Sequence, residues 1–226
     1  MAEEHGERTD WTASELSRLA RQLYTRGHWL MRRMQWYRPY ICPFNDMLQQ
    51  IPPGTSVLDV GCGGGLFLAL LHRVGRLGDG FGFDSSADAI RIAQHMAQGV
   101  NDAAGKPLLR FELRSVGQQW PDGPFDVVSL IDVMHHVPWL ARQELLGSIV
   151  SRIRPGGRLV YKDMGRQPQW RAWANTVHDL ILAREWVQYA PIAWVEATVR
   201  EMGLRLVHAR DINMFCYRHE LRVFQK

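Results

Sequence analysis

The chain has 226 residues, of which 46% are hydrophobic and 22% are charged. This length suits one domain, and the composition excludes disordered, collagen-like and fibrous proteins, because so apolar a chain can bury a sizeable core. The sequence has no apolar run of the roughly 18 residues that a membrane span needs, and its acidic first residues do not resemble a signal peptide. We therefore expect a cytoplasmic protein without a membrane span.

The basic residues are 24 arginines and 3 lysines, and the formal net charge is +4. Between Leu16 and Asn45 the sequence has no acidic residue and six arginines: Arg18, Arg21, Arg26, Arg32, Arg33 and Arg38. One interpretation is a patch that binds nucleic acid or another anionic partner. We favour the other, a solvated helix face whose long basic side chains cover apolar surface, and we expect no nucleic-acid partner.

The three cysteines, Cys42, Cys62 and Cys216, have no CxxC spacing. An odd number without this spacing predicts neither a disulfide framework nor a metal cluster. We expect reduced thiols and no metal site.

The first predicted helix starts near Thr12, because Thr12 to Glu15 has the form of a capping box and leucines follow at helical spacing. An aromatic-rich stretch with Trp29 and Trp36 comes next. A second helix is predicted over residues 44–50, before the helix-stopping Pro52-Pro53-Gly54.

After these helix-stopping residues, short apolar runs alternate with helical patterns, which is typical of a parallel sheet. Strands are predicted at 56–60, 80–84, 108–113, 125–131 and 158–162, and helices at 66–74, 87–98 and 139–153. A long helical pattern continues from 168 to about 187, followed by a helix at 194–202 and strands at 204–212 and 220–224. We therefore expect an α/β fold with a seven-stranded, mostly parallel sheet and helices on both faces.

The expected organisation is a single domain over residues 1–226. Residues 1–50 form an N-terminal helical cap, 51–165 a cofactor-binding core, 166–190 a helical lid after the fifth strand, and 191–226 a C-terminal helix with the last strands. No repeat or low-complexity linker divides the chain.

A glycine-rich turn, Gly61-Cys62-Gly63-Gly64-Gly65, follows the first strand. Glycines here allow positive φ and let a ligand approach the backbone. Leu66 departs from the dinucleotide fingerprint, and no Walker A loop is present. Asp59 precedes the turn, and the alternative to a ligand site is an ordinary tight turn in which Asp59 bonds backbone amides.

The second strand ends in Asp84, where a carboxylate can accept hydrogen bonds from both ribose hydroxyls of a nucleoside. NAD enzymes use the same geometry, so Asp84 alone does not name the cofactor. Ser85 or Ser86 is expected to cap the next helix.

These motifs, with the segment Ile131 to Pro138 and with Arg154-Pro155-Gly156-Gly157, resemble class I S-adenosylmethionine-dependent methyltransferases of the small-molecule type. The resemblance covers residues 56–165 and implies a Rossmann-like fold with S-adenosylmethionine as the cofactor. The residues it implies for cofactor binding are Asp59, Gly61, Cys62, Gly63, Asp84, Ser85, Ser115, Val116 and Ile131.

Two features depart from related patterns. Ser115 stands where the family usually has an acid that contacts adenine, so Ser115 and the backbone amide of Val116 are the candidates for this contact. The segment after the fourth strand also lacks the Asn/Asp-Pro-Pro-aromatic motif of nucleobase amino-methyltransferases.

His135 and His136 follow the fourth strand, at the edge where open α/β sheets bind ligands. An imidazole titrates near neutrality, so one of them is a candidate general base for an oxygen nucleophile. The alternative is that one histidine bonds the cofactor or the loop backbone and the other is exposed. Lys162 and Asp163 at the tip of the fifth strand are second candidates for this role and candidates for contacting the acceptor. Their alternative is an ion pair at the edge of the sheet.

Aromatic side chains predict a mostly apolar acceptor pocket. We expect Trp173 and Tyr189 from the lid on one side, and Trp36, Tyr37 and Tyr40 on the other. Core packing and a dimer contact are the alternatives for the lid residues.

The predicted function is methyl transfer to a small aromatic or apolar acceptor, most plausibly at a hydroxyl. The alternatives are an RNA methyltransferase that uses the arginine-rich segment, and a cofactor-binding partner protein without activity. The sequence leaves the oligomeric state open.

Overall fold

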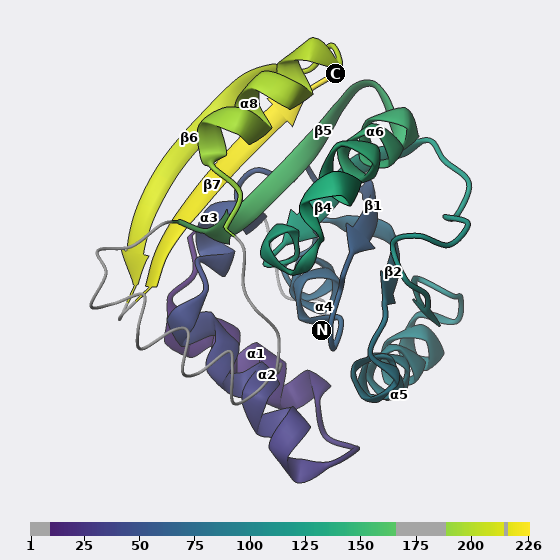
Figure 1. Ribbon diagram of the computed structural model, residues 1–226. Helices are drawn as coiled ribbons and strands as arrows, with labels where there is room; N and C mark the ends of the chain where they lie inside the picture. The colour runs from purple at the N-terminus through teal and green to yellow at the C-terminus, as the bar shows by residue number, and fades with distance from the viewer. Residues whose placement is uncertain (1–9, 166–188, 215–216) are drawn as a thin grey trace. The chain divides into compact units, whose positions relative to one another are not determined.

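The computed structural model describes residues 10–165, 189–214 and 217–226. The chain forms two compact units, an N-terminal unit of residues 1–120 and a C-terminal unit of residues 121–226, and Figure 1 shows their elements. Most of the predicted lid, with Trp173, and also Cys216 lie outside the described residues. The predicted subdivision of the chain stays a prediction.

The first helix of the N-terminal unit, α1 (Ala13–Leu23), begins with the predicted capping box. The hydroxyl of Thr12 accepts a hydrogen bond from the Glu15 amide at 3.3 Å, and the Thr12 amide donates to Glu15 Oε2 at 2.9 Å. Leu16, Ser17 and Ala20 form its buried face. The residue pattern therefore predicted both the start and the buried side of this helix.

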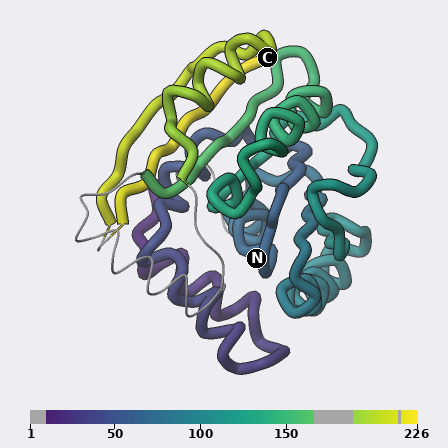
Figure 2. The backbone as a smooth tube through the Cα atoms, in the orientation of Figure 1, coloured from purple at the N-terminus to yellow at the C-terminus, as the bar shows by residue number. Residues whose placement is uncertain are grey.

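A second helix, α2 (Trp29–Ile41), occupies the aromatic-rich stretch for which no helix was predicted. Its N-cap, His28, makes no side-chain cap, and Pro39 lies in its last turn, so the usual sequence signals are missing. Packing on α1 supports it instead: Ser17 Oγ donates to the Trp36 carbonyl at 2.7 Å, and the two helices run side by side in Figures 1 and 2. The short α3 (Phe44–Leu48) follows.

The strands of the N-terminal unit are β1 (Thr55–Val60), β2 (Leu77–Asp84) and β3 (Leu109–Leu113). They are parallel in the order β3-β2-β1, and Gly82 of β2 is in register with Asp59 on one side and Phe111 on the other. Two helices connect them, α4 (Leu66–Arg73) and α5 (Ala87–Ala104). The turns after β1 and β2 therefore lie at one edge of this part of the sheet.

The C-terminal unit contains β4 (Phe125–Ile131), β5 (Ile153–Met164), β6 (Arg205–Met214) and β7 (Tyr217–Gln225). Strand β4 is parallel to β5, and β7 lies antiparallel between β5 and β6. Its helices are α6 (Arg142–Arg152) and α8 (Ile192–Glu201), with two short 3-10 helices, η1 (Met134–His136) and η2 (Trp139–Ala141). The seven strands belong to one mostly parallel sheet, which confirms the predicted fold class.

Several predicted bounds are wrong: β2 begins at Leu77 instead of residue 80, and α5 ends at Ala104 instead of residue 98. The helix expected over residues 139–153 is divided into η2 and α6, and Ile153 already begins β5. A proline followed by two glycines predicts a turn at Pro155 to Gly157, but these residues lie inside β5, where Lys226 pairs with them: Gly156 N donates to the Lys226 carbonyl at 2.9 Å, and Lys226 N donates to the Gly157 carbonyl at 3.0 Å. Such pairing between distant segments has no local sequence signal.

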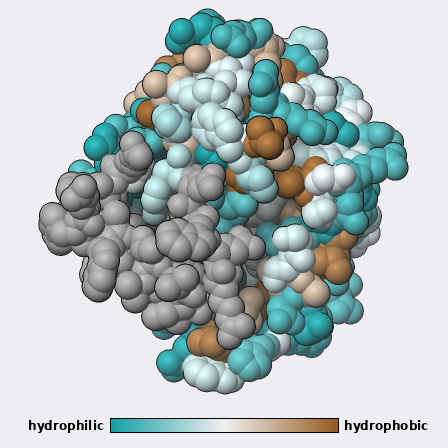
Figure 3. All heavy atoms as spheres, in the orientation of Figure 1, coloured by the Kyte–Doolittle hydropathy of each residue, from teal (hydrophilic) through white to brown (hydrophobic). Residues whose placement is uncertain are grey.

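On the face drawn in Figure 3, hydrophobic residues are scattered among hydrophilic ones where the chain is described. Five of the most exposed large apolar side chains belong to α2: Trp29, Leu30, Met34, Tyr37 and Tyr40.

No helix among residues 10–165, 189–214 and 217–226 is long and apolar enough to cross a membrane.

The close approach of Phe111 to the glycine turn generates a stability prediction. Gly65 has φ of +77°, and a Cβ there would lie 2.6 Å from Phe111 Cζ. We expect Gly65→Ala to lower the free energy of unfolding by roughly 2 to 4 kcal/mol, through backbone strain and overpacking. Urea unfolding measures this change.

Gly99→Ala is the matched control, since Gly99 lies within α5 and a Cβ there meets nothing within 4 Å. It should raise stability by about 0.5–1 kcal/mol, because alanine favours a helix interior. Equal stability of Gly65→Ala and the wild type would contradict the packing described for the turn.

Candidate functional site

The glycine turn between β1 and α4 is the centre of the candidate site in the N-terminal unit. Gly61, Gly63 and Gly65 all have positive φ, at +68°, +54° and +77°. In β2, a Cβ at Gly82 would lie 2.8 Å from Phe111 Cδ1. The backbone here takes a path that residues with side chains rarely follow, as expected of a turn that a ligand approaches closely.

Asp84 ties the end of β2 to this turn. Its Oδ2 accepts a hydrogen bond from Gly63 N at 2.8 Å, and its Oδ1 accepts one from Ser86 N at 2.8 Å. Each carboxylate oxygen can accept a further hydrogen bond. These two bonds therefore orient Asp84 and leave it able to accept hydrogen bonds from a ligand. Ser86 is the residue that caps α5, through a 3.3 Å bond from Ala89 N, while Ser85 is exposed.

Carboxyl groups lie beside the buried base of the turn. Asp59 is only 2% exposed. Burial raises the pKa of the Cys62 thiol well above its usual range, and the nearby carboxylates of Asp59 and Asp84 raise it further. The thiol therefore stays protonated at neutral pH. This environment suits a cationic or hydroxyl-rich ligand.

Three residues from the N-terminal helices reach the same turn and were not predicted. The Tyr24 hydroxyl donates to the Gly64 carbonyl at 2.7 Å, and burial keeps its pKa well above the usual range. The amide of Gln35 lies against Gly64, and Arg38 Nη1 lies 3.7 Å from the position of a Cβ on Gly63. Tyr24 follows the end of α1, and Gln35 and Arg38 lie in α2. Neither segment contains a sequence motif that indicates a cofactor site.

The end of β3 carries the residues expected near adenine. Ser115 is exposed, and its amide donates to Gln118 Oε1 at 2.8 Å. The Val116 carbonyl accepts a bond from Trp120 Nε1 at 2.8 Å, and the Trp120 ring contacts Phe83 edge-on, with centroids 5.0 Å apart. The adenine contact of Ser115 and Val116 stays a prediction.

In the C-terminal unit, β4 ends at the buried Ile131 and leads into η1, which carries both candidate histidines. His135 Nδ1 lies 2.5 Å from Asp163 Oδ1, and the His135 amide donates to Asp163 Oδ2 at 3.2 Å. Both residues are buried, at 3% exposure each. His136 is exposed, and its ring centroid lies 4.1 Å from that of His135. The fold thus separates two adjacent histidines into one held by a carboxylate and one at the surface.

Lys162 forms an ion pair that holds the turn before η1. Its Nζ lies 2.5 Å from Asp132 Oδ1, and its carbonyl accepts a bond from Asp132 N at 2.8 Å. Asp132 has φ of +57°, a strained conformation for a residue with a side chain. An ion pair was the alternative considered for Lys162 and Asp163, and the structure forms it between Lys162 and Asp132, while Asp163 pairs with His135.

The predicted acceptor residues lie in different settings. The Tyr189 ring lies 6.3 Å from the His135 ring, so the structure brings these two together. Tyr37 and Tyr40 are exposed, with ring centroids 6.0 Å apart. Trp36 differs from them, because it is half-buried and carries the guanidinium of Arg32 over its ring at 5.1 Å.

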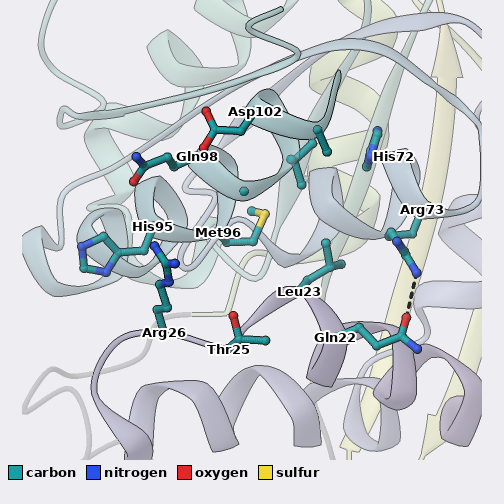
Figure 4. Close-up of a pocket in the computed structure, with 13 residues that line it drawn as sticks. Gln22, Leu23, Thr25, Arg26, His72, Arg73, His95, Met96, Gln98 and Asp102 are labelled. Atoms are coloured by element: carbon teal, nitrogen blue, oxygen red, sulfur yellow. Dashed lines mark hydrogen bonds between the residues drawn. The ribbon is translucent and has the colours of Figure 1, made fainter. Parts of the chain in front are cut away.

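Two pockets of the N-terminal unit involve none of the predicted site residues. Figure 4 shows one of ≈ 330 Å³, between the end of α1, the end of α4 and the middle and end of α5, where Arg73 Nη2 donates to Gln22 Oε1 at 2.7 Å. The other, of ≈ 350 Å³, lies between the start of α2 and α5 and is lined by Gly27, His28, Leu30, Met31, Asp88, Arg91, Ile92 and His95. The site is therefore defined by the turn residues and not by the pockets.

Comparison with known proteins identifies the family. The profile of a family described as a methyltransferase domain matches residues 30–209. The chain belongs to this family. Its membership confirms the predicted S-adenosylmethionine-dependent methyltransferase class.

Ubiquinone biosynthesis O-methyltransferases are among the relatives of this methyltransferase. The protein from Albidiferax ferrireducens is 30% identical over 140 residues, which cover 61% of this chain and 48% of the relative. The one from Acinetobacter baylyi is 24% identical over 159 residues, covering 68% and 64%. This chain thus spans about half to two thirds of the length of these curated relatives.

Solved structures show the same fold. The magnesium protoporphyrin IX methyltransferase from Synechocystis with bound SAM aligns with a TM-score of 0.64 and 18% identity, covering 92% of this chain and 90% of that chain. An O-methyltransferase family protein from Burkholderia thailandensis aligns with a TM-score of 0.66 and 22% identity, covering 87% and 57%.

The position of Asp84 generates a binding prediction. Replacing its carboxylate in Asp84→Ala should weaken S-adenosylhomocysteine binding by roughly ten- to a hundred-fold, because a charged acceptor of two hydrogen bonds is lost. Isothermal calorimetry measures the affinity.

Asp88→Ala is the control, because Asp88 is an exposed carboxylate in the first turn of α5 that pairs with Arg91. The affinity of the Asp88→Ala variant for S-adenosylhomocysteine should equal that of the wild type. A folded Asp84→Ala variant with unchanged affinity would refute the assignment of Asp84.

Proposed function

We propose that this methyltransferase transfers the methyl group of S-adenosylmethionine to a hydroxyl of a small aromatic or apolar acceptor. The observation that carries the proposal is the buried His135–Asp163 pair beyond the carboxyl end of β4, because an oxygen nucleophile needs a proton acceptor. The names of the curated relatives, which are O-methyltransferases, support the same chemistry.

The residues of the N-terminal unit fit this cofactor. When bound, S-adenosylmethionine supplies a methyl group on a sulfonium leaving group. The glycine turn lets its methionine end approach the backbone, and the buried carboxylate of Asp59 favours the positive charges at that end. Asp84 is held by two backbone amides with capacity to accept ribose hydroxyls. We assign Gly61, Cys62, Gly63, Ser85, Ser115, Val116 and Ile131 to the remaining contacts of the cofactor.

His135 acts as the general base in this proposal. A proton on Nδ1 satisfies the Asp163 carboxylate, so Nε2 carries the basic lone pair. Asp163 stabilises the imidazolium that forms when the hydroxyl proton is taken up, as the carboxylate does in other histidine–aspartate pairs. His136 is exposed to solvent, where water competes for its ring nitrogens, and it is the weaker candidate.

Lys162 has a positioning role. Its bonds to both the side chain and the backbone of Asp132 fix the strained residue from which the chain enters η1. The ion pair thereby helps to hold His135 against Asp163.

For the acceptor we propose an apolar, aromatic environment. Tyr189 is the first contact, because its ring lies near His135. Trp36, Tyr37 and Tyr40 are proposed to contribute from α2, and Trp173 from the predicted lid. A small-molecule acceptor and a cytoplasmic location complete the proposal.

RNA methylation is not favoured, since arginines of the basic segment contact its own aromatic rings. Arg32 and Arg21 lie over Trp36 at 5.1 and 5.7 Å, and Arg33 lies over Trp29 at 5.9 Å. These contacts support the packing interpretation of the arginines. A partner protein without activity is not favoured either, because the His135–Asp163 pair has the arrangement of an acid–base group.

The proposed base generates a kinetic prediction. With an alkylcatechol as the probe acceptor, His135→Ala should lower the rate of methyl transfer by about a hundred-fold or more, because the general base is lost. Asp163→Asn should lower it as well, because the carboxylate that orients the His135 ring is lost. Initial rates across pH, together with S-adenosylhomocysteine affinities, measure both effects.

His136→Ala is the matched control and should keep most of the rate. Full rates for His135→Ala at every pH, in a protein that binds the cofactor normally, would exclude this base.

Acceptor selectivity provides a separate prediction. Tyr189→Ala should change the ratio of kcat/KM between an aromatic and an aliphatic hydroxyl acceptor, because a ring that packs on the acceptor is removed. The affinity for S-adenosylhomocysteine and the melting temperature should stay near those of the wild type. A large fall in melting temperature with unchanged selectivity would identify Tyr189 as a packing residue.

A further inference from the structure

The side chain of Gln35 is buried on the glycine turn. Gln35 lies in α2 and is only 4% exposed. Its amide Nε2, Cδ and Oε1 lie 2.6, 2.8 and 3.2 Å from the position that a Cβ on Gly64 would occupy. The Gln35 amide therefore fills the space that a side chain at residue 64 would need. This contact explains why residue 64 is a glycine, although its φ is not positive.

The carbonyl oxygen of this amide is the unusual atom. Gln35 Oε1 is buried and has no hydrogen-bond partner within the described parts of the chain. Leaving a buried acceptor without a donor costs free energy, and native proteins rarely do so without a reason. A donor from a ligand would remove this cost.

The surroundings indicate which donor would fit. The turn below carries the carboxyl group of the buried Asp59, and the Tyr24 hydroxyl already donates to the Gly64 carbonyl. On the same turn, Arg38 brings a cation close to Gly63. A group with a positive donor and a nearby negative charge complements this arrangement, and an amino-acid zwitterion has both.

We propose that Gln35 binds the amino-acid end of the cofactor, with Oε1 accepting a hydrogen bond from its α-ammonium group. This inference rests on the proposed function, because S-adenosylmethionine provides the amino acid. Asp84 already has the geometry for the ribose, so the ammonium is the donor left for an acceptor placed on Gly64. The N-terminal helices would then recognise the cofactor as well as cover it.

The test compares two ligands that differ only in this ammonium. S-adenosylhomocysteine carries it, and 5′-S-(3-carboxypropyl)-5′-thioadenosine keeps the adenosine, the sulfur and the carboxylate but lacks the amino group. Gln35→Met removes the acceptor at similar size, and competition calorimetry on the full chain measures the affinity for both ligands.

We expect Gln35→Met to weaken S-adenosylhomocysteine binding by roughly ten- to a hundred-fold, because a buried bond to a charged donor is lost. The affinity for the deamino ligand should change less than about two-fold, because this ligand has no ammonium group to which Gln35 could bind. Gln35→Glu keeps an acceptor and should restore binding of S-adenosylhomocysteine to within a few-fold of the wild type. Gln49→Met, at an exposed glutamine, should alter neither affinity.

Equal losses for both ligands would show that Gln35 only packs the turn and would overturn the proposal, as would unchanged affinity for both. These outcomes differ from failure of the proposed function itself, in which the wild-type protein binds neither ligand.

Discussion

The glycine turn after β1 is the constraint on which the N-terminal unit depends. Its backbone takes positive φ at three glycines, and the surrounding side chains fill the space that Cβ atoms would need: Phe111 from β3 beside Gly65, and Gln35 from α2 beside Gly64. Asp84 bonds Gly63 N from the end of β2. One turn thus fixes the position of two strand ends and one helix, and with them the carboxyl groups that we propose to bind the cofactor.

The C-terminal unit has a related arrangement around a strained aspartate. Lys162 holds Asp132 at positive φ, and the chain then turns into η1, where Asp163 holds His135. Neighbouring residues of β5, Lys162 and Asp163, therefore bind consecutive parts of one loop. Burial strengthens both interactions, because little water competes with them. If His135 is the base, as we propose, holding it in this way reduces the entropy lost when an acceptor binds, which is the advantage of a preorganised site.

Local patterns predicted much of this structure. The capping box at Thr12, the strand that ends in Asp84 and the histidines after β4 all carry their signal within a few residues. Contacts between distant residues were not predictable in this way. Asp163 lies 28 residues from His135, and Tyr24 lies 40 residues from Gly64. Helix α2, with its polar Gln35, lacks a cap and depends on packing against α1, so its place on the turn appears only in the fold.

The most direct test of the account is transfer of an isotopically labelled methyl group from S-adenosylmethionine to matched acceptors. A 4-alkylcatechol, the corresponding 4-alkyl-1,2-phenylenediamine and the corresponding 4-alkyl-1,2-benzenedithiol present two hydroxyls, two amines and two thiols on the same apolar ring. Mass spectrometry of the products locates the label. We expect methylation of a catechol oxygen as the main product. Preferential labelling of the amine, or cofactor binding without transfer to any of the three, would contradict it.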